Sequence, residues 1–200
     1  MAIKVANNQS LSAITALPAA VSGGAMTLLE TQTASGSSTL SFTSGIDSTY
    51  DEYVFRFYDF NPATDAQSLT FQASINGGSS YGVTVTTTWF NAYHAEADGS
   101  PDIGYSSGLD IAQGTGYQPI GYQTGNGADE SQAGTLTLYS PSSTTFVKHF
   151  IARASNYRSN DFIEDSFCAG YFNTTSAINA IQFKPESGNF DGVIKMYGVV

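Results

Sequence analysis

The chain has 200 residues, of which 41% are hydrophobic and 13% are aromatic. This length and this apolar content are enough for one domain with a sizeable core. Only 12% of the residues are charged, and 7 Lys and Arg against 17 Asp and Glu give a net charge of −10. Such a chain is not expected to bind nucleic acid or an anionic membrane surface, and no stretch is apolar for long enough to span a bilayer.

The first 26 residues differ in composition from the rest of the chain. They are rich in small and polar residues and contain no aromatic side chain. We predict an N-terminal arm over residues 1–26, held by the body of the protein or by a neighbouring subunit. Its expected attachment points are Leu11, Ile14, Leu17 and Val21. The alternative interpretation is a short local helix over residues 11–17.

After this segment, strand patterns recur at short intervals, and residues 27–200 are predicted to form one β-sandwich domain. Thr, Val, Ile, Tyr and Phe are abundant and suit a pleated, half-buried surface. The expected strands are 28–33, 39–43, 53–57, 69–75, 83–92, 135–139, 146–154, 167–173, 178–184 and 193–198, with weaker candidates at 103–105 and 117–122. About ten short strands separated by turns predict an all-β, antiparallel sandwich of jelly-roll type.

The clearest alternation of apolar and polar side chains lies at residues 69–75, where Leu69 and Phe71 share one face. Residues 76–78 follow with the sequence Asn-Gly-Gly, whose residues tolerate positive φ angles. This pattern predicts a hairpin that leads directly into a return strand at residues 83–92.

Residues 93–133 form a long stretch dominated by Gly, Asp, Gln and Tyr. Loops of this length in a compact domain are typically functional or pack against partners. The aromatic residues in or beside this stretch are Trp89, Phe90, Tyr93, Tyr105, Tyr117 and Tyr122. Their rings are candidates for stacking on sugars or anchoring a protein interface. The alternative is that they pack the loops onto the sandwich.

The sequence contains no recognisable catalytic residue, metal site or cofactor motif. His94, Glu96 and Asp98 would share a face in an extended chain, but their spacing matches no known metal site, and we expect a polar loop edge. The acidic cluster at residues 161–165 is the best candidate for binding an ion, although it lacks the calcium-loop pattern. The single cysteine, Cys168, is expected to be a small buried hydrophobe. We therefore predict that the protein is not an enzyme.

Several segments resemble small structural proteins of tailed phages that infect aquatic bacteria. The resemblance covers residues 6–57, and it continues in SSTTFVKHFIARA (142–154), AGYFNTTSAINAIQF (169–183) and NFDGVIKMYGV (189–199). Residues 93–133 are the least characteristic part. The resemblance implies a virion component, made in the host cytoplasm and located on the particle surface, with a jelly-roll-like body and no catalytic residues.

Three functional hypotheses remain open at this point. The first is a head decoration (cement) protein, attached through its arm to capsid proteins and assembled as a homotrimer. The second is a tail-fibre or baseplate module that binds a host-surface glycan through the loops at 93–133. The third is a glycan-active enzyme, for which Glu96 and Asp98 would be the first carboxylates to test.

Overall fold

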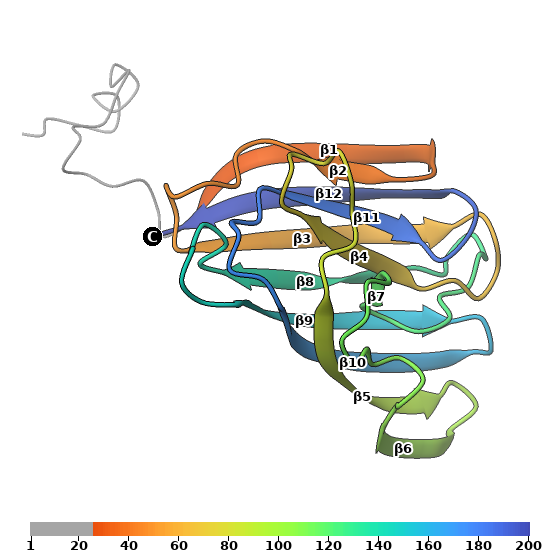
Figure 1. The fold of residues 1–200 in the computed structure, drawn as a ribbon. Coiled ribbons are helices and arrows are strands. Elements are labelled where there is room, and N and C mark those ends of the chain that lie inside the picture. The colour runs from red at the N-terminus through yellow and green to blue at the C-terminus, as the bar shows by residue number, and fades with distance from the viewer. Residues whose placement is uncertain (1–25) are drawn as a thin grey trace, which may run out of the picture.

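The computed structural model describes residues 26–200, so the predicted arm, with Leu11, Ile14, Leu17 and Val21, lies outside the described residues. The described chain forms two antiparallel sheets that pack as a sandwich, which confirms the predicted fold class (Figure 1). In order across the sheet, the large sheet contains β1 (Thr27–Ser37), β12 (Phe190–Val199), β3 (Glu52–Pro62), β8 (Gln132–Tyr139), β9 (Lys148–Arg158), β10 (Phe162–Phe172), β5 (Val85–Ala95) and β6 (Gly99–Tyr105). The small sheet contains β2 (Leu40–Phe42), β11 (Ala180–Pro185), β4 (Leu69–Ser74) and β7 (Gln118–Pro119). None of the elements in this part of the chain is a helix, and no membrane-spanning helix is found there.

The strand order has the nested pairing of a jelly roll. β1 pairs with β12, β2 with β11, β3 with β8 and β4 with β7, so the chain folds as one long hairpin wound into two sheets. β9, β10, β5 and β6 extend the large sheet beyond β8. In Figure 1 the small sheet lies over the jelly-roll half of the large sheet, and the connection from β6 to β8 lies over the extension.

Phenylalanine is the most frequent residue type in the core between the sheets. Phe71 on β4 packs edge-on against Phe150 on β9 and Phe172 on β10, at ring-centroid distances of 5.0 and 6.2 Å. Phe42 of the small sheet meets Phe55 of the large sheet edge-on, and the Phe183 ring packs against Phe55 in a tilted arrangement. Edge-to-face aromatic packing at these separations is favourable beyond the burial of apolar area.

The hairpin predicted at residues 76–78 is wrong. Gly77 and Gly78 do adopt positive φ angles of 68° and 83°. However, the chain crosses there from the small sheet to the large one, because β4 pairs with β11 and β7 while β5 pairs with β10 and β6. All six residues of β4 are buried, so the strand is covered on both faces and its apolar alternation does not identify its partner.

Candidate functional site

The six aromatic residues predicted to form a recognition surface lie in three different places. Trp89 is fully buried in the core, so it is not a surface residue. Phe90 lies on the outer face of the large sheet, where its ring stacks on that of Phe167 at 4.8 Å. Tyr117 lies against the small sheet, where its hydroxyl bonds Gln182 and the amino group of Lys184 lies 4.4 Å from its ring centroid.

The other three predicted residues, Tyr93, Tyr105 and Tyr122, line one cleft of about 550 Å³. Tyr93 comes from β5, Tyr105 ends β6, and Tyr122 belongs to the connection between β7 and β8. The remaining lining residues are Asn91, Ser106, Ser107, Gly108, Leu109 and Arg158. We call this site the tyrosine cleft. It combines ring faces with hydroxyl, amide and guanidinium groups, the mixture with which proteins orient polar small molecules.

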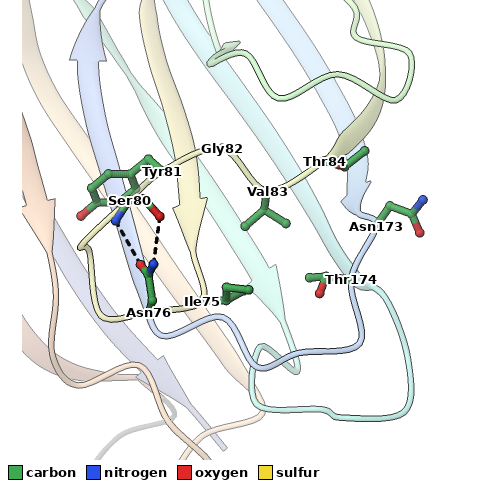
Figure 2. Close-up of a pocket in the computed structure, with 9 residues that line it drawn as sticks. All are labelled: Ile75, Asn76, Ser80, Tyr81, Gly82, Val83, Thr84, Asn173 and Thr174. Atoms are coloured by element: carbon green, nitrogen blue, oxygen red, sulfur yellow. Dashed lines mark hydrogen bonds between the residues drawn. The ribbon is translucent and has the colours of Figure 1, made fainter.

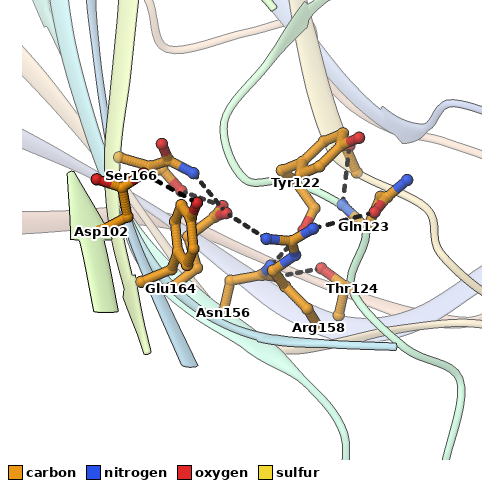
Figure 3. A network of polar contacts seen from close by, with 11 residues as sticks. Asp102, Tyr122, Gln123, Thr124, Asn156, Arg158, Glu164 and Ser166 are labelled. Carbon is orange, nitrogen blue, oxygen red and sulfur yellow. Dashed lines mark hydrogen bonds and ion pairs between the residues drawn. The ribbon is translucent and has the colours of Figure 1, made fainter. Parts of the chain in front are cut away.

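Arg158, the last residue of β9, lies in the wall of the tyrosine cleft. Its guanidinium carbon lies 4.8 Å from the ring centroid of Tyr122. Figure 3 shows the guanidinium between Glu164 and Gln123, at N–O distances of 3.6 and 3.2 Å. Only 12% of the Arg158 side chain is exposed, so the group is oriented by its partners before any ligand arrives.

Glu164 lies beneath the cleft on the inner face of β10 and is fully buried. Its carboxylate accepts hydrogen bonds from the Asn91 amide at 2.8 Å and from the Ser166 hydroxyl at 3.2 Å. Burial raises the pKa of Glu164 above its usual range, and the hydrogen bond from Asn91 and the positive charge of Arg158 only partly oppose this effect. Asn91 and Arg158, which line the cleft, are therefore tied to a buried carboxyl group.

Two carboxylates hold the tyrosines at the mouth of the cleft. The Tyr93 hydroxyl donates to Asp102 at 3.3 Å, and the Tyr105 hydroxyl donates to Asp110 at 2.5 Å. The second bond raises the pKa of Tyr105, because the carboxylate stabilises the protonated phenol. Both contacts fix the direction in which each hydroxyl points.

A buried polar network fastens the connection between β7 and β8 to the large sheet. Asn156 on β9 donates from its amide to the Tyr122 carbonyl at 2.5 Å, and its other amide atom bonds the Thr124 hydroxyl. Thr124 also bonds Gln132 of β8 at 3.1 Å. The labelled side chains of Figure 3 show this network beside the Arg158 guanidinium. It anchors the backbone of this connection at Tyr122 and Thr124, and the Tyr122 ring lines the cleft.

The other predicted sites of chemistry do not gather around the cleft. The imidazole of His94, near the end of β5, lies 3.7 Å from the carboxylate of Asp98 in the following turn. Neither residue lines the tyrosine cleft. In the cluster at 161–165, Glu164 is buried on the inner face while Asp165 bonds Arg153 at 2.6 Å on the outer face. Among the described residues no group of three His, Cys, Asp or Glu side chains is arranged to hold a metal. Cys168 is buried as predicted, and burial raises its pKa to about 12.

A second cavity lies at one end of the sandwich, between the turn after β4 and the end of β10. Figure 2 shows Asn76 bonding Ser80 on one side, with Asn173 and Thr174 opposite. The cavity measures about 360 Å³, and the buried Tyr81 hydroxyl near it has no hydrogen-bond partner in the described chain. It offers a single aromatic residue and no charged side chain, so it has fewer means of recognising a ligand than the tyrosine cleft.

Sequence reasoning missed the polar half of the tyrosine cleft, namely Asn91, Ser106, Ser107, Arg158 and the supporting Glu164. Asn91 and Glu164 occupy buried inward positions of β5 and β10, on the same face as Trp89 and Phe172. A buried polar residue in such a position is unusual, and this is the signal by which the sequence points to the site.

Comparisons of this chain with protein-family models, with curated proteins and with solved structures found no match. The resemblance to phage structural proteins therefore stays a prediction from the sequence. The fold and the tyrosine cleft define the chain as a jelly-roll β-sandwich with a candidate ligand-binding cleft.

Proposed function

We propose that this protein is a non-enzymatic β-sandwich subunit of a tailed-phage particle that binds a host-surface saccharide in the tyrosine cleft. The observation that carries the proposal is the convergence of Tyr93, Tyr105 and Tyr122 beside Asn91 and Arg158. Tyrosine rings present an apolar face to the C–H side of a sugar and a polar edge to its hydroxyls. Amide and guanidinium groups add directional hydrogen bonds.

The hydrogen bonds that the carboxylates near the cleft already make favour saccharide binding over glycoside hydrolysis. Hydrolysis needs two carboxyl groups free to face the scissile bond. Here Asp102 and Asp110 each accept a hydrogen bond from a tyrosine, and Glu164 is enclosed by Asn91, Ser166 and Arg158. Glu96 and Asp98, the carboxylates that the enzyme hypothesis would use, belong to a turn outside the cleft.

The place of the protein on the particle is inferred from its proposed ligand, because the resemblance to phage structural proteins does not assign a position. A module that contacts a host glycan belongs to a tail fibre or baseplate, at the surface of the virion. Its other partners would be further copies of itself and the neighbouring tail proteins. The tyrosine cleft lies at the extension of the large sheet, and the strand order puts β5 and β6 at the opposite edge of that sheet from β1.

The experiment is to replace the exposed rings of the cleft and measure saccharide binding. Tyr105→Ala and Tyr93→Ala should each weaken binding about three- to tenfold, the loss expected for one aromatic contact. Binding is measured on an array of bacterial surface polysaccharides and then by titration calorimetry. Tyr58→Ala, which removes an exposed ring from the outer face of β3, is the matched control. Absence of binding by the wild type, or equal losses in the control, would contradict the proposal.

A second candidate function, head decoration, is favoured by the outer face of the large sheet. Ile151 on β9 and Ile163 on β10 are 53% and 50% exposed, and the Phe90–Phe167 stack lies on the same face, with Asp165 between Phe167 and Ile163 on β10. Exposed apolar groups on a flat sheet suit contact with another copy or with a capsid protein. Quantitative mass spectrometry of purified particles tests this candidate, which requires a copy number comparable to that of the capsid subunit.

A further inference from the structure

We infer that the tyrosine cleft is selective for neutral or amino saccharides and rejects acidic ones such as uronate, sialylated or sulfated chains. This inference rests on the proposed function, saccharide binding in the cleft, and assigns the chemical class of its ligand. Two independent features of the cleft lead to it: the balance of charge around it and the direction of its hydrogen-bonding groups.

The mouth of the cleft carries negative charge that no cation balances. Asp102 is exposed, Asp110 is half-buried, and each is joined through a hydrogen bond to a tyrosine that lines the cleft. No Lys or Arg of the described chain lies within 4.0 Å of either carboxylate, since neither forms an ion pair. Neither aspartate lines the cleft itself, but each is bonded to a tyrosine that does, so an acidic ligand group in the cleft would be repelled by two nearby like charges.

The one cation that lines the cleft is already occupied. One terminal nitrogen of Arg158 faces Glu164, the other donates to Gln123, and the flat guanidinium lies against the ring of Tyr122. A ligand carboxylate usually binds arginine through two parallel hydrogen bonds from its terminal nitrogens. A ligand carboxylate would have to compete with Glu164 and Gln123 for these terminal nitrogens, and the remaining nitrogen, Nε, is buried without a partner. Arg158 is therefore a poor site for an acidic saccharide.

The direction of the tyrosine hydroxyls also favours ligands that carry hydrogen-bond donors. Each hydroxyl has one proton, and in Tyr93 and Tyr105 that proton is directed to an aspartate. Their oxygen lone pairs and the carboxylate oxygens then remain as acceptors. Sugar hydroxyl, amide and ammonium groups can donate to such acceptors, whereas carboxylate and sulfate groups offer only acceptors.

The test is a double variant, Asp102→Asn together with Asp110→Asn, that removes both negative charges. The asparagine oxygen can still accept the tyrosine hydrogen bond, so the rings keep their positions while the negative charge is removed. We expect the ratio of acidic to neutral affinity to rise about fivefold or more at low ionic strength, and the rise to shrink as salt is added. Affinities are measured on neutral, amino-sugar and acidic bacterial polysaccharides.

Asp51→Asn is the matched control, because it removes one carboxylate just before β3, outside the cleft, and should leave the affinity ratio unchanged. If the wild type prefers acidic polysaccharides at low salt, or the double variant leaves the ratio unaltered, the inference is overturned while saccharide binding stands. If the wild type binds no polysaccharide of any class, the proposed function fails and the inference falls with it.

Discussion

Glu164 is the residue whose environment departs furthest from that of an ordinary surface carboxylate. It is fully buried, and its charge is balanced by Arg158 and by hydrogen bonds from Asn91 and Ser166. Burial raises its pKa in the folded protein. Because the unfolded chain restores the ordinary value of 4.5, the ionisation of this one group is linked to folding.

This linkage predicts a pH-dependent difference between the wild type and Glu164→Gln. Well below pH 4.5 the carboxyl is protonated in both states and contributes nothing to the pH dependence. As the pH rises from 4.5 through the raised pKa, the unfolded state ionises first, so the wild type loses stability and the variant does not. Over this pH range the free energy of unfolding of the variant should therefore rise relative to that of the wild type.

Urea unfolding of both proteins at a series of pH values measures this change, with Asp51→Asn as the control for removing an exposed carboxylate. The variant can be less stable overall, because Arg158 loses its partner. Only the slope of the difference with pH tests the argument. A difference that stays flat or falls above pH 4.5 would show that burial does not dominate the environment of Glu164.

At the scale of elements, β10 is the strand that joins the core to the cleft. It pairs with β9 and β5 along all eleven of its residues without a bulge. The same strand places Phe172 in the phenylalanine core and Glu164 beneath the cleft. Gly170 lies at a point of this strand where the neighbouring residues leave no room for a side chain.

Gly170→Ala is predicted to destabilise the protein by about 1–3 kcal/mol, the usual cost of overpacking a core. A Cβ at this position would meet the Thr86 carbonyl oxygen at 2.5 Å and the Phe150 ring at 2.9 Å. Gly104→Ala in β6 is the matched control, because a Cβ there meets nothing within 4 Å. Thermal and urea unfolding compare the two variants, and equal stabilities would contradict the predicted clash.

Across the whole molecule, the two sheets are held together by aromatic rings rather than by ion pairs. The three ion pairs of the described chain all lie outside the phenylalanine core. Cys168 is the only cysteine in the chain, so no disulfide within the chain links the sheets. The packing of rings such as Phe71, Phe150 and Phe183 across the interface therefore provides most of the cohesion between the sheets.

Phe71→Ala should lower the free energy of unfolding by about 3–5 kcal/mol, because it removes a buried ring and leaves a cavity between the sheets. The matched control is Phe146→Ala, since the Phe146 side chain is 71% exposed and its loss should be close to neutral. Urea denaturation followed by far-ultraviolet circular dichroism gives both values. A small effect at Phe71 would mean that the core can collapse around the missing ring.

Much of this architecture could be predicted from the sequence. The alternation of apolar residues and the recurrent turns identify the class of fold and most strands, because one buried sheet face imposes a period of two on the sequence. The same period does not determine which strands pair with one another. The chain at residues 76–78 turns between sheets instead of forming a hairpin, because β4 finds its hydrogen bonds with β11 and β7.

The sequence by itself determined that this chain is a β-sandwich rich in aromatic residues, since composition and alternation depend only on local burial. It also singled out Tyr93, Tyr105 and Tyr122 among its candidate residues. Only the tertiary structure decided that these three share a cleft while Trp89, Phe90 and Tyr117 lie elsewhere. The reason is physical: neighbouring residues of a strand point to opposite faces, and residues far apart along the chain, such as Asn91 and Arg158, meet only when the sheet is assembled.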